Sequence, residues 1–488
     1  MKSDHNILGV SSGYHDAAVT VINSQGEIAY AGHAERYSKR KNDANLNVDM
    51  LFEAARGRPI DHIAYYETPW RKQTRRWYAG QGIEWNRITT RQVLREQLYG
   101  YFSSVPVSTY QHHLSHAAAG FQTSPFDRAT VVVIDAIGEW DTITIWAAEY
   151  NKKGQAGYRR LWRQQYPNSI GLFYSAVTER IGLRPLDEEY ITMGMAAYGE
   201  PIYTDTMQLL VNENCHLGVD PTVLQQARDV DIAASAQAVV EQEIYKVMQR
   251  AQAFGFSSNL VYQGGVALNC LANRNLGEYF EKIWIMPCPG DAGSSLGAAA
   301  LAYGGRVKWT NAYLGTEISG EYPVDACVDS LLRDQIVGVA SGRAEFGPRA
   351  LGNRSLLADP RGSDIKDRVN EIKRRQQFRP FAPVVLEEHA GEYFDLPGGF
   401  VDTRYMQVVG RCRHPDVYPA ICHHDHTSRI QTVPRDGSGI RQLLEAWYAR
   451  TGCPMLLNTS LNIRGEPMVN DRADADRFER LYGVTVHS

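Results

Sequence analysis

A pair of histidines four residues apart is the feature of this sequence most suited to chemistry. His112 and His116 lie in the segment 111–116, which also contains His113, and four small residues follow at 117–120. Small apolar residues are compatible with a helix, and this spacing would then project both imidazoles from one face toward a common ion. The alternative is that these histidines are ordinary core or surface polar groups.

A metal-binding pair of histidines also needs carboxylates, and two aspartates lie where strands are expected to end. Asp135 closes the apolar run 131–134, and Asp291 lies in the turn 289–293 after the apolar run 283–286. Two imidazoles and two carboxylates, with no thiolate, suit iron, zinc or manganese. The sequence therefore predicts a metal site with the ligands His112, His116, Asp135 and Asp291.

Length and composition describe an ordinary globular protein. The 488 residues predict two to four domains, and the net charge of -4 gives no overall nucleic-acid signature. Seven scattered cysteines without a CxxC pair favour a reducing cytoplasm. We expect no secretory signal, because residues 1–5 precede only a short apolar run, and no membrane span, because no apolar stretch approaches about 18 residues.

Two strand–turn–strand units resemble each other. Strands at 7–11 and 17–22 flank a turn at 12–16, and strands at 131–135 and 142–149 flank a turn at 136–141. Gly13 matches Gly138 in this comparison, and Asp16 matches Asp141, which indicates an internal duplication unless the two hairpins are alike by chance. Duplicated α/β halves are typical of the actin, sugar-kinase and Hsp70 (ASKHA) plan, in which glycine turns approach nucleotide phosphates.

Two further glycine-rich turns follow predicted strands. One spans 263–269, and the other spans 290–297 and opens an alanine-rich helix. A helix N-terminus after such a turn can receive phosphate, although single glycine turns more often only reverse the chain. The predicted nucleotide-binding residues of these turns are Gly264, Gly265, Asn269 and Ser294, together with Gly13 and Gly138.

The pattern loosens around residues 310–330, where we place a boundary between domains 1–320 and 330–488. Arginine is dense beyond it, at positions 343, 349, 354, 361, 374, 375 and 379, with Lys373 among them. Guanidinium groups bind phosphate and acyl-phosphate oxygens in pairs. With Arg429 and the polar segment 458–462, the cluster predicts an anion site, although each residue taken singly could be structural.

The chain resembles the NodU/CmcH-type O-carbamoyltransferases, and the resemblance covers nearly the whole sequence. The motifs that carry it are YHD at 14–16, AER at 34–36, HHLSH at 112–116, MGMAAYG at 193–199, GGVALN at 264–269, GPRALGNRS at 347–355, FRPFAP at 378–383, NTS at 458–460 and GEP at 465–467.

The resemblance implies an N-terminal ASKHA-like domain and a C-terminal YrdC-like α/β domain. The second domain would make carbamoyl-adenylate from carbamoyl phosphate and ATP, with Mg(II) accompanying ATP, and the intermediate would pass inside the protein to the first. There the family holds Fe(II) at positions matching the four ligands named above and transfers the carbamoyl group to an alcohol. The anion-site residues would be Arg349, Lys373, Arg375, Arg379, Arg429, Ser460 and Asn462.

Adenylation suits this chemistry because a carbamoyl carbonyl is a sluggish electrophile, and a metal can polarise an oxygen of the activated group. A neutral alcohol also needs help losing its proton, and His15 is the candidate base. A histidine that merely caps its turn is the alternative.

Two positions depart from the family pattern. The family usually has lysine before the segment 193–199, where this chain has Ile191 and Thr192. The family often has Asp-Gly-Thr where this chain has His426 between Asp425 and Thr427. These differences leave open any role of that amine and the conformation of that turn.

The acceptor is the least determined part of the function. Segment 70–101 carries seven basic residues against two acidic ones, interleaved with aromatic rings. This suits a hydroxymethyl-pyrimidine such as 5-hydroxymethylcytosine, in nucleotides or in phage-type DNA. An amphipathic helical insert beside a sugar or natural-product alcohol is slightly favoured. The basic residues are Arg71, Lys72, Arg75, Arg76, Arg87, Arg91 and Arg95.

Two other functions remain as alternatives. Transfer of threonylcarbamoyl to tRNA uses the same domain types, but both domains on one chain with the long motif at 347–355 argue against it. A nucleotide-gated scaffold of the Hsp70 plan would have no use for the metal ligands or the arginine cluster. An oligomer is compatible with every alternative.

Overall fold

The computed structural model describes residues 5–488, and the chain divides into two compact units. The first comprises residues 5–38, 42–272 and 276–311, and the second comprises 39–41, 273–275 and 312–488. Each unit is described by itself below. Within residues 5–488, no helix has the length and apolar character needed to cross a membrane.

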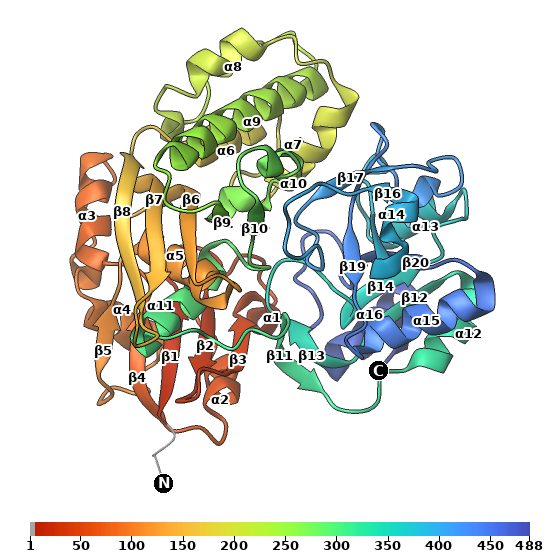
Figure 1. Ribbon diagram of the computed structural model, residues 1–488, viewed down its shortest axis with the longest axis horizontal. Helices are drawn as coiled ribbons and strands as arrows, with labels where there is room; N and C mark the ends of the chain where they lie inside the picture. The colour runs from red at the N-terminus through yellow and green to blue at the C-terminus, as the bar shows by residue number, and fades with distance from the viewer. Residues whose placement is uncertain (1–4) are drawn as a thin grey trace. The chain divides into compact units, whose positions relative to one another are not determined.

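Two five-stranded sheets form the frame of the first unit (Figure 1). The first has the order β3-β2-β1-β4-β5, and the second has the order β10-β9-β6-β7-β8. The first sheet contains β1 (Asn6–Ser11), β2 (Ala18–Ile22), β3 (Ile28–His33), β4 (Ile60–Tyr65) and β5 (Val107–Thr109). The second contains β6 (Arg128–Gly138), β7 (Asp141–Tyr150), β8 (Ala156–Gln165), β9 (Asn259–Gln263) and β10 (Lys282–Trp284).

The two sheets have the same topology. In each sheet, the first three strands of the chain pair antiparallel. The fourth strand then pairs parallel with the first, and the fifth pairs parallel with the fourth. This repetition confirms the predicted duplication and the ASKHA-like α/β plan.

One long helix follows the last strand of each sheet, and these two helices pack against each other. Helix α5 (His112–Thr123) also contacts β6 and β9, whereas α11 (Ser294–Tyr303) also contacts β1 and β2. Gly297 permits this contact, because a Cβ there would lie 1.8 Å from the Ser115 carbonyl oxygen. The helices that follow the two sheets therefore meet in the middle of the unit.

The remaining helices of the first unit cover outer surfaces. Figure 1 shows α6 to α9 grouped at one end of the second sheet, and α2 packs on β2 and β3. Helices α3 and α4 form the insert between β4 and β5. Their bounds are α1 Glu35–Ser38, α2 Val48–Ala55, α3 Pro69–Tyr78, α4 Thr90–Gln97, α6 Ile170–Arg180, α7 Glu189–Met195, α8 Thr204–Leu210, α9 Asp229–Ala253 and α10 Cys270–Asn273.

The second unit is a mixed α/β structure around a six-stranded sheet of order β19-β15-β20-β14-β12-β21. Two smaller sheets, β16-β17-β18 and β11-β13, accompany it. Its strands are β11 Tyr313–Ile318, β12 Ile336–Ala340, β13 Gly342–Glu345, β14 Arg354–Ala358, β15 Ala382–Leu386, β16 Phe394–Asp395, β17 Val409–Cys412, β18 Thr427–Arg429, β19 Gln431–Val433, β20 Met455–Ser460 and β21 Val486–His487. Its helices are α12 Val324–Asp334, α13 Ile365–Ile372, α14 Ala390–Tyr393, α15 Gly439–Thr451 and α16 Arg472–Tyr482.

Two segments differ from the sequence-based expectation. The predicted turn at 136–141 is only Glu139 and Trp140, because β6 continues to Gly138 and β7 begins at Asp141. The loosened segment near 310 forms strand β11, which pairs antiparallel with β13, so the compact units change at Asn311–Ala312, before residue 320.

Candidate metal centre

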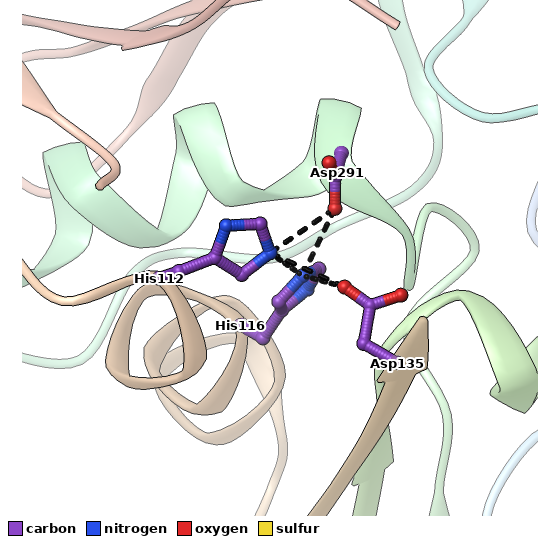
Figure 2. Close-up of side chains that lie close together, drawn as sticks. All are labelled: His112, His116, Asp135 and Asp291. Carbon is purple, nitrogen blue, oxygen red and sulfur yellow. Dashed lines mark hydrogen bonds and ion pairs between the residues drawn. The ribbon is translucent and has the colours of Figure 1, made fainter. Parts of the chain in front are cut away.

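The four predicted metal ligands lie together in the first unit (Figure 2). Nε2 of His112 lies 3.2 Å from Asp135 Oδ2 and 3.2 Å from Asp291 Oδ1. Nε2 of His116 lies 3.3 Å from each of the same two oxygens and 3.0 Å from His112 Nε2. One ligand atom from each residue lies within 4.8 Å of all the others.

These separations fit one divalent ion. Metal–nitrogen and metal–oxygen bonds of about 2.0–2.1 Å place neighbouring ligand atoms about 3.0 Å apart in an octahedral site and about 3.3 Å apart in a tetrahedral one. The five separations that involve a histidine, 3.0–3.3 Å, fall in this interval, and the two carboxylate oxygens lie within 4.8 Å of each other. The ligand set suits iron, zinc or manganese.

The duplicated fold explains how distant residues meet. His112 begins α5 and His116 follows one turn later, while Asp291 lies in the 3-10 turn Asp291–Gly293 that leads into α11. Asp135 lies on β6, against which α5 packs. The ligands therefore come from the N-terminal ends of the two central helices and from the strand beside them.

A turn predicted to bind phosphate also contacts a candidate metal ligand. Oδ1 of Asp135 accepts hydrogen bonds from the backbone amides of Ala136 (2.9 Å) and Gly265 (3.2 Å), which leaves Oδ2 facing the histidines. Gly264 makes this approach possible, because its φ is +93° and a Cβ would lie 2.1 Å from the Ile134 carbonyl oxygen.

The electrostatics of the ion-free site show mutual charge stabilisation. Burial disfavours charge, but the Asp291 charge and the hydrogen bonds to Asp135 and Asp291 outweigh it and raise the pKa of His112 well above its usual value. Burial also opposes the charged form of His116, and the same two carboxylates raise its pKa. Burial would raise the pKa of Asp135, but hydrogen bonds from both histidines hold it well below the usual range. These contacts therefore favour protonated histidines and ionised aspartates.

His15, the candidate base, lies at the edge of this cluster. Its Nδ1 lies 2.9 Å from Asp16 Oδ2, and its Nε2 lies 3.6 Å from Asp291 Oδ2. Burial opposes charge, but Asp291 and Asp16 raise the pKa of His15 to about 9. These two carboxylates therefore favour the protonated form of His15.

Charged neighbours that sequence reasoning missed surround the first turn of α5. Glu139 accepts hydrogen bonds from the backbone amides of Thr68 (2.7 Å) and His112 (3.3 Å) and from Arg71 Nε (2.7 Å). Glu67 pairs with Lys72. Glu67 follows β4 at a strand end, as Asp291 does after β10, and that position was the only signal in the sequence.

Several predicted nucleotide-binding residues have local partners. Asn269 exchanges two hydrogen bonds of 3.0 Å with Gln237. Gly138 lies against the rings of His112 and His113, where a Cβ would come within 2.5 Å of both. Gly13 has a φ of +92° and donates to the Ala44 carbonyl, and Ser294 is buried at the start of α11. Their role toward a nucleotide stays a prediction.

In the second unit, Lys373 lies beside Ser460 and Asn462, as predicted for the anion site. Its buried ammonium donates to the carbonyl oxygens of both residues and to Asn462 Oδ1. Burial and the charges of Arg375 and Arg379 lower the pKa of Lys373 well below its usual value. Lys373 thus fixes the segment after β20, and the two arginines are the nearby cations.

The other arginines separate into different environments. Arg354 is fully buried and donates to the carbonyl oxygens of Ser341, Gly342, Asn353, Thr316 and Asn470, and Arg361 pairs with Asp359. Both guanidinium groups therefore have partners within the second unit. Arg349 lies half-buried between β13 and β14, and Arg429 lies half-buried at the end of β18.

The two departures from the family pattern have structural explanations. His426 has a φ of +61°, in the left-handed region that glycine favours, so the turn keeps the conformation expected of Asp-Gly-Thr. Ile191 and Thr192 are buried on α7, and the Thr192 hydroxyl hydrogen-bonds Thr178 on α6 at 2.8 Å. This part of α7 packs rather than presenting an amine.

The basic residues of segment 70–101 are mostly engaged with acidic ones. Ion pairs join Arg71 to Glu139, Lys72 to Glu67, Arg76 to Glu84 and Arg87 to Glu96. Arg75 is buried and donates to the Glu139 carbonyl. The rings of Trp70, Trp77, Tyr78 and Trp85 are exposed. The segment is the amphipathic helical insert that the sequence favoured.

Comparisons with known proteins match both halves of the chain. The family model described as "Carbamoyltransferase N-terminus" matches residues 6–217 and 214–300, and "Carbamoyltransferase C-terminus" matches residues 328–485. A solved activator of 2-hydroxyisocaproyl-CoA dehydratase from Clostridium difficile aligns over 61% of this chain and 94% of its own, at 14% identity and a TM-score of 0.35.

Curated relatives align over nearly the full length. An uncharacterized protein of Synechocystis is 32% identical over 97% of this chain and 94% of its own. The nodulation protein NolNO of Sinorhizobium fredii is 31% identical over 94% of this chain and 76% of its own. The 3'-hydroxymethylcephem-O-carbamoyltransferase of Amycolatopsis lactamdurans is 28% identical over 96% of each chain. The chain therefore belongs to the NodU/CmcH carbamoyltransferase family and is a carbamoyltransferase.

Proposed function

We propose that this carbamoyltransferase is an ATP-dependent O-carbamoyltransferase that works in two steps. The second unit converts carbamoyl phosphate, ATP and one water molecule into carbamoyl-adenylate, phosphate and pyrophosphate: water takes the phosphoryl group of carbamoyl phosphate, and the carbamate oxygen displaces pyrophosphate from the α-phosphorus of ATP. The first unit transfers the carbamoyl group from the adenylate to an acceptor hydroxyl and releases AMP. The observation that carries the proposal is the convergence of the four metal ligands in a chain whose two halves both match carbamoyltransferases.

In the adenylating step, arginines bind the phosphates of the substrates. Arg375 and Arg379 lie near Lys373, whose ammonium holds Ser460 and Asn462 in place. Planar guanidinium groups donate paired hydrogen bonds to phosphate oxygens. Arg349 and Arg429 are additional candidates for the same anions. Mg(II) accompanies ATP.

In the transfer step, the acceptor hydroxyl must lose a proton while the carbonyl carbon is attacked. His112, His116, Asp135 and Asp291 would hold a divalent ion, Fe(II) by family resemblance, which supplies Lewis acidity when bound. His15 adjoins Asp291 and is the candidate base. His15 can act as a base only in its neutral form. A cation held by the four ligands would lower the raised pKa of His15 and so favour that form.

The acceptor that the insert fits best is a compact alcohol. The cephem relative is named for a substrate with a hydroxymethyl group, a primary alcohol. Four of the basic residues at 70–101 are neutralised by carboxylates, which weakens the argument for a DNA polyanion, whereas exposed rings can stack on sugars. A hydroxymethyl-pyrimidine nucleotide remains the second candidate, because those rings would stack on a base as well.

The test uses the intact protein with ATP, labelled carbamoyl phosphate and a panel of sugars, natural-product alcohols, hydroxymethyl nucleotides, hydroxymethylated DNA and tRNA. We expect pyrophosphate release that requires carbamoyl phosphate, and label in a product only when a small alcohol or nucleotide is present. If pyrophosphate release never depends on carbamoyl phosphate, the two-step proposal is wrong and the nucleotide-gated scaffold is favoured. Label in DNA or tRNA alone would instead move the acceptor to nucleic acid.

A further inference from the structure

Glu67 is held in a fixed position beside the metal ligands by its two neighbours in the chain. The Tyr66 amide donates to the Val10 carbonyl at 3.1 Å, and the Tyr66 carbonyl accepts from the Ser115 hydroxyl of α5 at 2.9 Å. On the other side, the Thr68 amide donates to Glu139 at 2.7 Å. The backbone on both sides of Glu67 is therefore tied to β1, to α5 and to Glu139.

The Glu67 side chain is buried and lies between a ligand histidine and a lysine. Oε2 lies 3.8 Å from His112 Nδ1, and Oε1 accepts a 2.7 Å hydrogen bond from Lys72 Nζ. Nδ1 of His112 is buried and has no hydrogen-bond partner among the described residues. Glu67 is therefore placed where this nitrogen needs an acceptor.

The orientation of His112 determines which nitrogen is free for Glu67. Nε2 faces the other three ligands at 3.0–3.2 Å, so an ion would bind Nε2 and the remaining proton would stay on Nδ1. A metal-bound histidine commonly donates that distal N–H to a carboxylate, which fixes the tautomer and ring orientation and makes the imidazole a stronger ligand.

We propose that Glu67, held by Lys72, is a positioning residue for the metal centre that accepts the Nδ1–H of metal-bound His112. The inference rests on the proposed metal site. Lys72 belongs to α3, and its ammonium also lies 5.3 Å from the centre of the Tyr14 ring, which neighbours His15. The insert that carries the exposed rings is thereby joined to one metal ligand through the Lys72–Glu67 pair.

A second buried carboxylate provides a matched control. Glu139 is as buried as Glu67 and lies at the same end of α5, but it accepts from the backbone amide of His112 instead of facing its ring. If only the negative charge near the ion mattered, losing either carboxylate would have a similar effect. If the contact with Nδ1 matters, Glu67 has the larger effect on the ion.

The experiment measures binding of Co²⁺ alone to the intact protein, by chelator competition and by the visible absorption of the bound ion. Variants are Glu67→Gln, Glu67→Gln with Lys72→Met, and Glu139→Gln. We expect Glu67→Gln to weaken Co²⁺ binding about tenfold or more and to shift the absorption bands. The double variant leaves no unpaired lysine, which guards against misfolding, and it should show the same loss of affinity. Glu139→Gln should show a smaller loss.

Three results would overturn the inference while leaving the metal site intact. The first is unchanged Co²⁺ affinity and spectrum in Glu67→Gln. The second is wild-type affinity in the double variant, which would assign the loss to unpaired Lys72. The third is a loss of affinity in Glu139→Gln as large as that in Glu67→Gln. If the unmodified protein binds no Co²⁺, the metal site and this inference both fail.

Discussion

At the scale of single residues, the four candidate metal ligands are expected to exchange protons for an ion. Without an ion, carboxylate contacts raise the pKa values of His112 and His116, and histidine contacts lower that of Asp135. Because the pKa values of these histidines are raised in the folded state, their protonation stabilises the fold fully below their unfolded pKa of about 6.5. This contribution is lost as the pH rises through their folded pKa. The aspartates contribute above about pH 3.9, and this is lost as pH falls through their lowered pKa.

The same pKa shifts predict that metal binding depends on pH. Binding requires neutral imidazoles, so an ion entering at neutral pH must displace the protons of His112 and His116. We expect about two protons released per Co²⁺ and an affinity that rises with pH, measured by calorimetry in buffers of different ionisation enthalpy. His116→Ala should remove both the binding and the release. Co²⁺ binding that does not change with pH and releases no protons would show that the histidines are not ligands.

Sequence alone predicted the four ligands but not their surroundings. A spacing of four residues on a helix and two aspartates at strand ends are local signals, and the structure brings them together. Glu67 and Glu139 reach the ligands through contacts between distant segments, and apart from the position of Glu67 after a strand no local pattern distinguishes them from other buried acids. Arginine density at 343–379 likewise predicted an anion site, but it could not show that Arg354 points inward to backbone carbonyls.

This interior role of Arg354 predicts a stability defect. Arg354→Lys removes donors from several buried carbonyl groups and should lower the free energy of unfolding by about 3 kcal/mol or more, measured by urea denaturation. Arg361→Lys, at a partly exposed pair with Asp359, should change it by less than about 1 kcal/mol. Wild-type stability of Arg354→Lys combined with lost adenylate formation would instead place Arg354 in the anion site.

At the scale of elements, the contact between α5 and α11 holds the ligands together. His112 and His116 lie on α5 and Asp291 precedes α11, so the separation of these helices sets the ligand distances. Both helices and the duplicated hairpins were predicted from the pattern of small and apolar residues and from the glycine-rich turns. The sequence did not predict the two-residue turn between β6 and β7 or strand β11, because turn length and strand pairing depend on partners elsewhere in the chain.

Gly297→Ala tests the importance of this helix contact. The added Cβ would lie 1.8 Å from the Ser115 carbonyl oxygen, so the helices must separate. We expect a loss of about 2 kcal/mol or more in unfolding free energy and weaker Co²⁺ binding. Gly194→Ala is the matched control, because its Cβ on α7 meets nothing within 4 Å and should stabilise by about 0.5–1 kcal/mol. Equal behaviour of the two variants would contradict the close packing.

At the scale of the whole molecule, each compact unit is proposed to carry out one chemical step. The first unit contains the metal ligands and His15, and the second contains Lys373, Arg375 and Arg379. Separate sites keep the chemistry of activation from constraining that of transfer, and a reactive adenylate formed away from bulk water is less exposed to hydrolysis. The family resemblance predicted this division, whereas composition and length alone predicted only several domains.

The most direct test of this division measures both steps in one set of variants. His112→Ala and Asp291→Ala should abolish carbamoyl transfer to the acceptor while carbamoyl-phosphate-dependent pyrophosphate release continues. Arg379→Ala should abolish pyrophosphate release while transfer from supplied carbamoyl-adenylate survives. Equal loss of pyrophosphate release in both classes of folded variant would contradict the assignment of one step to each unit.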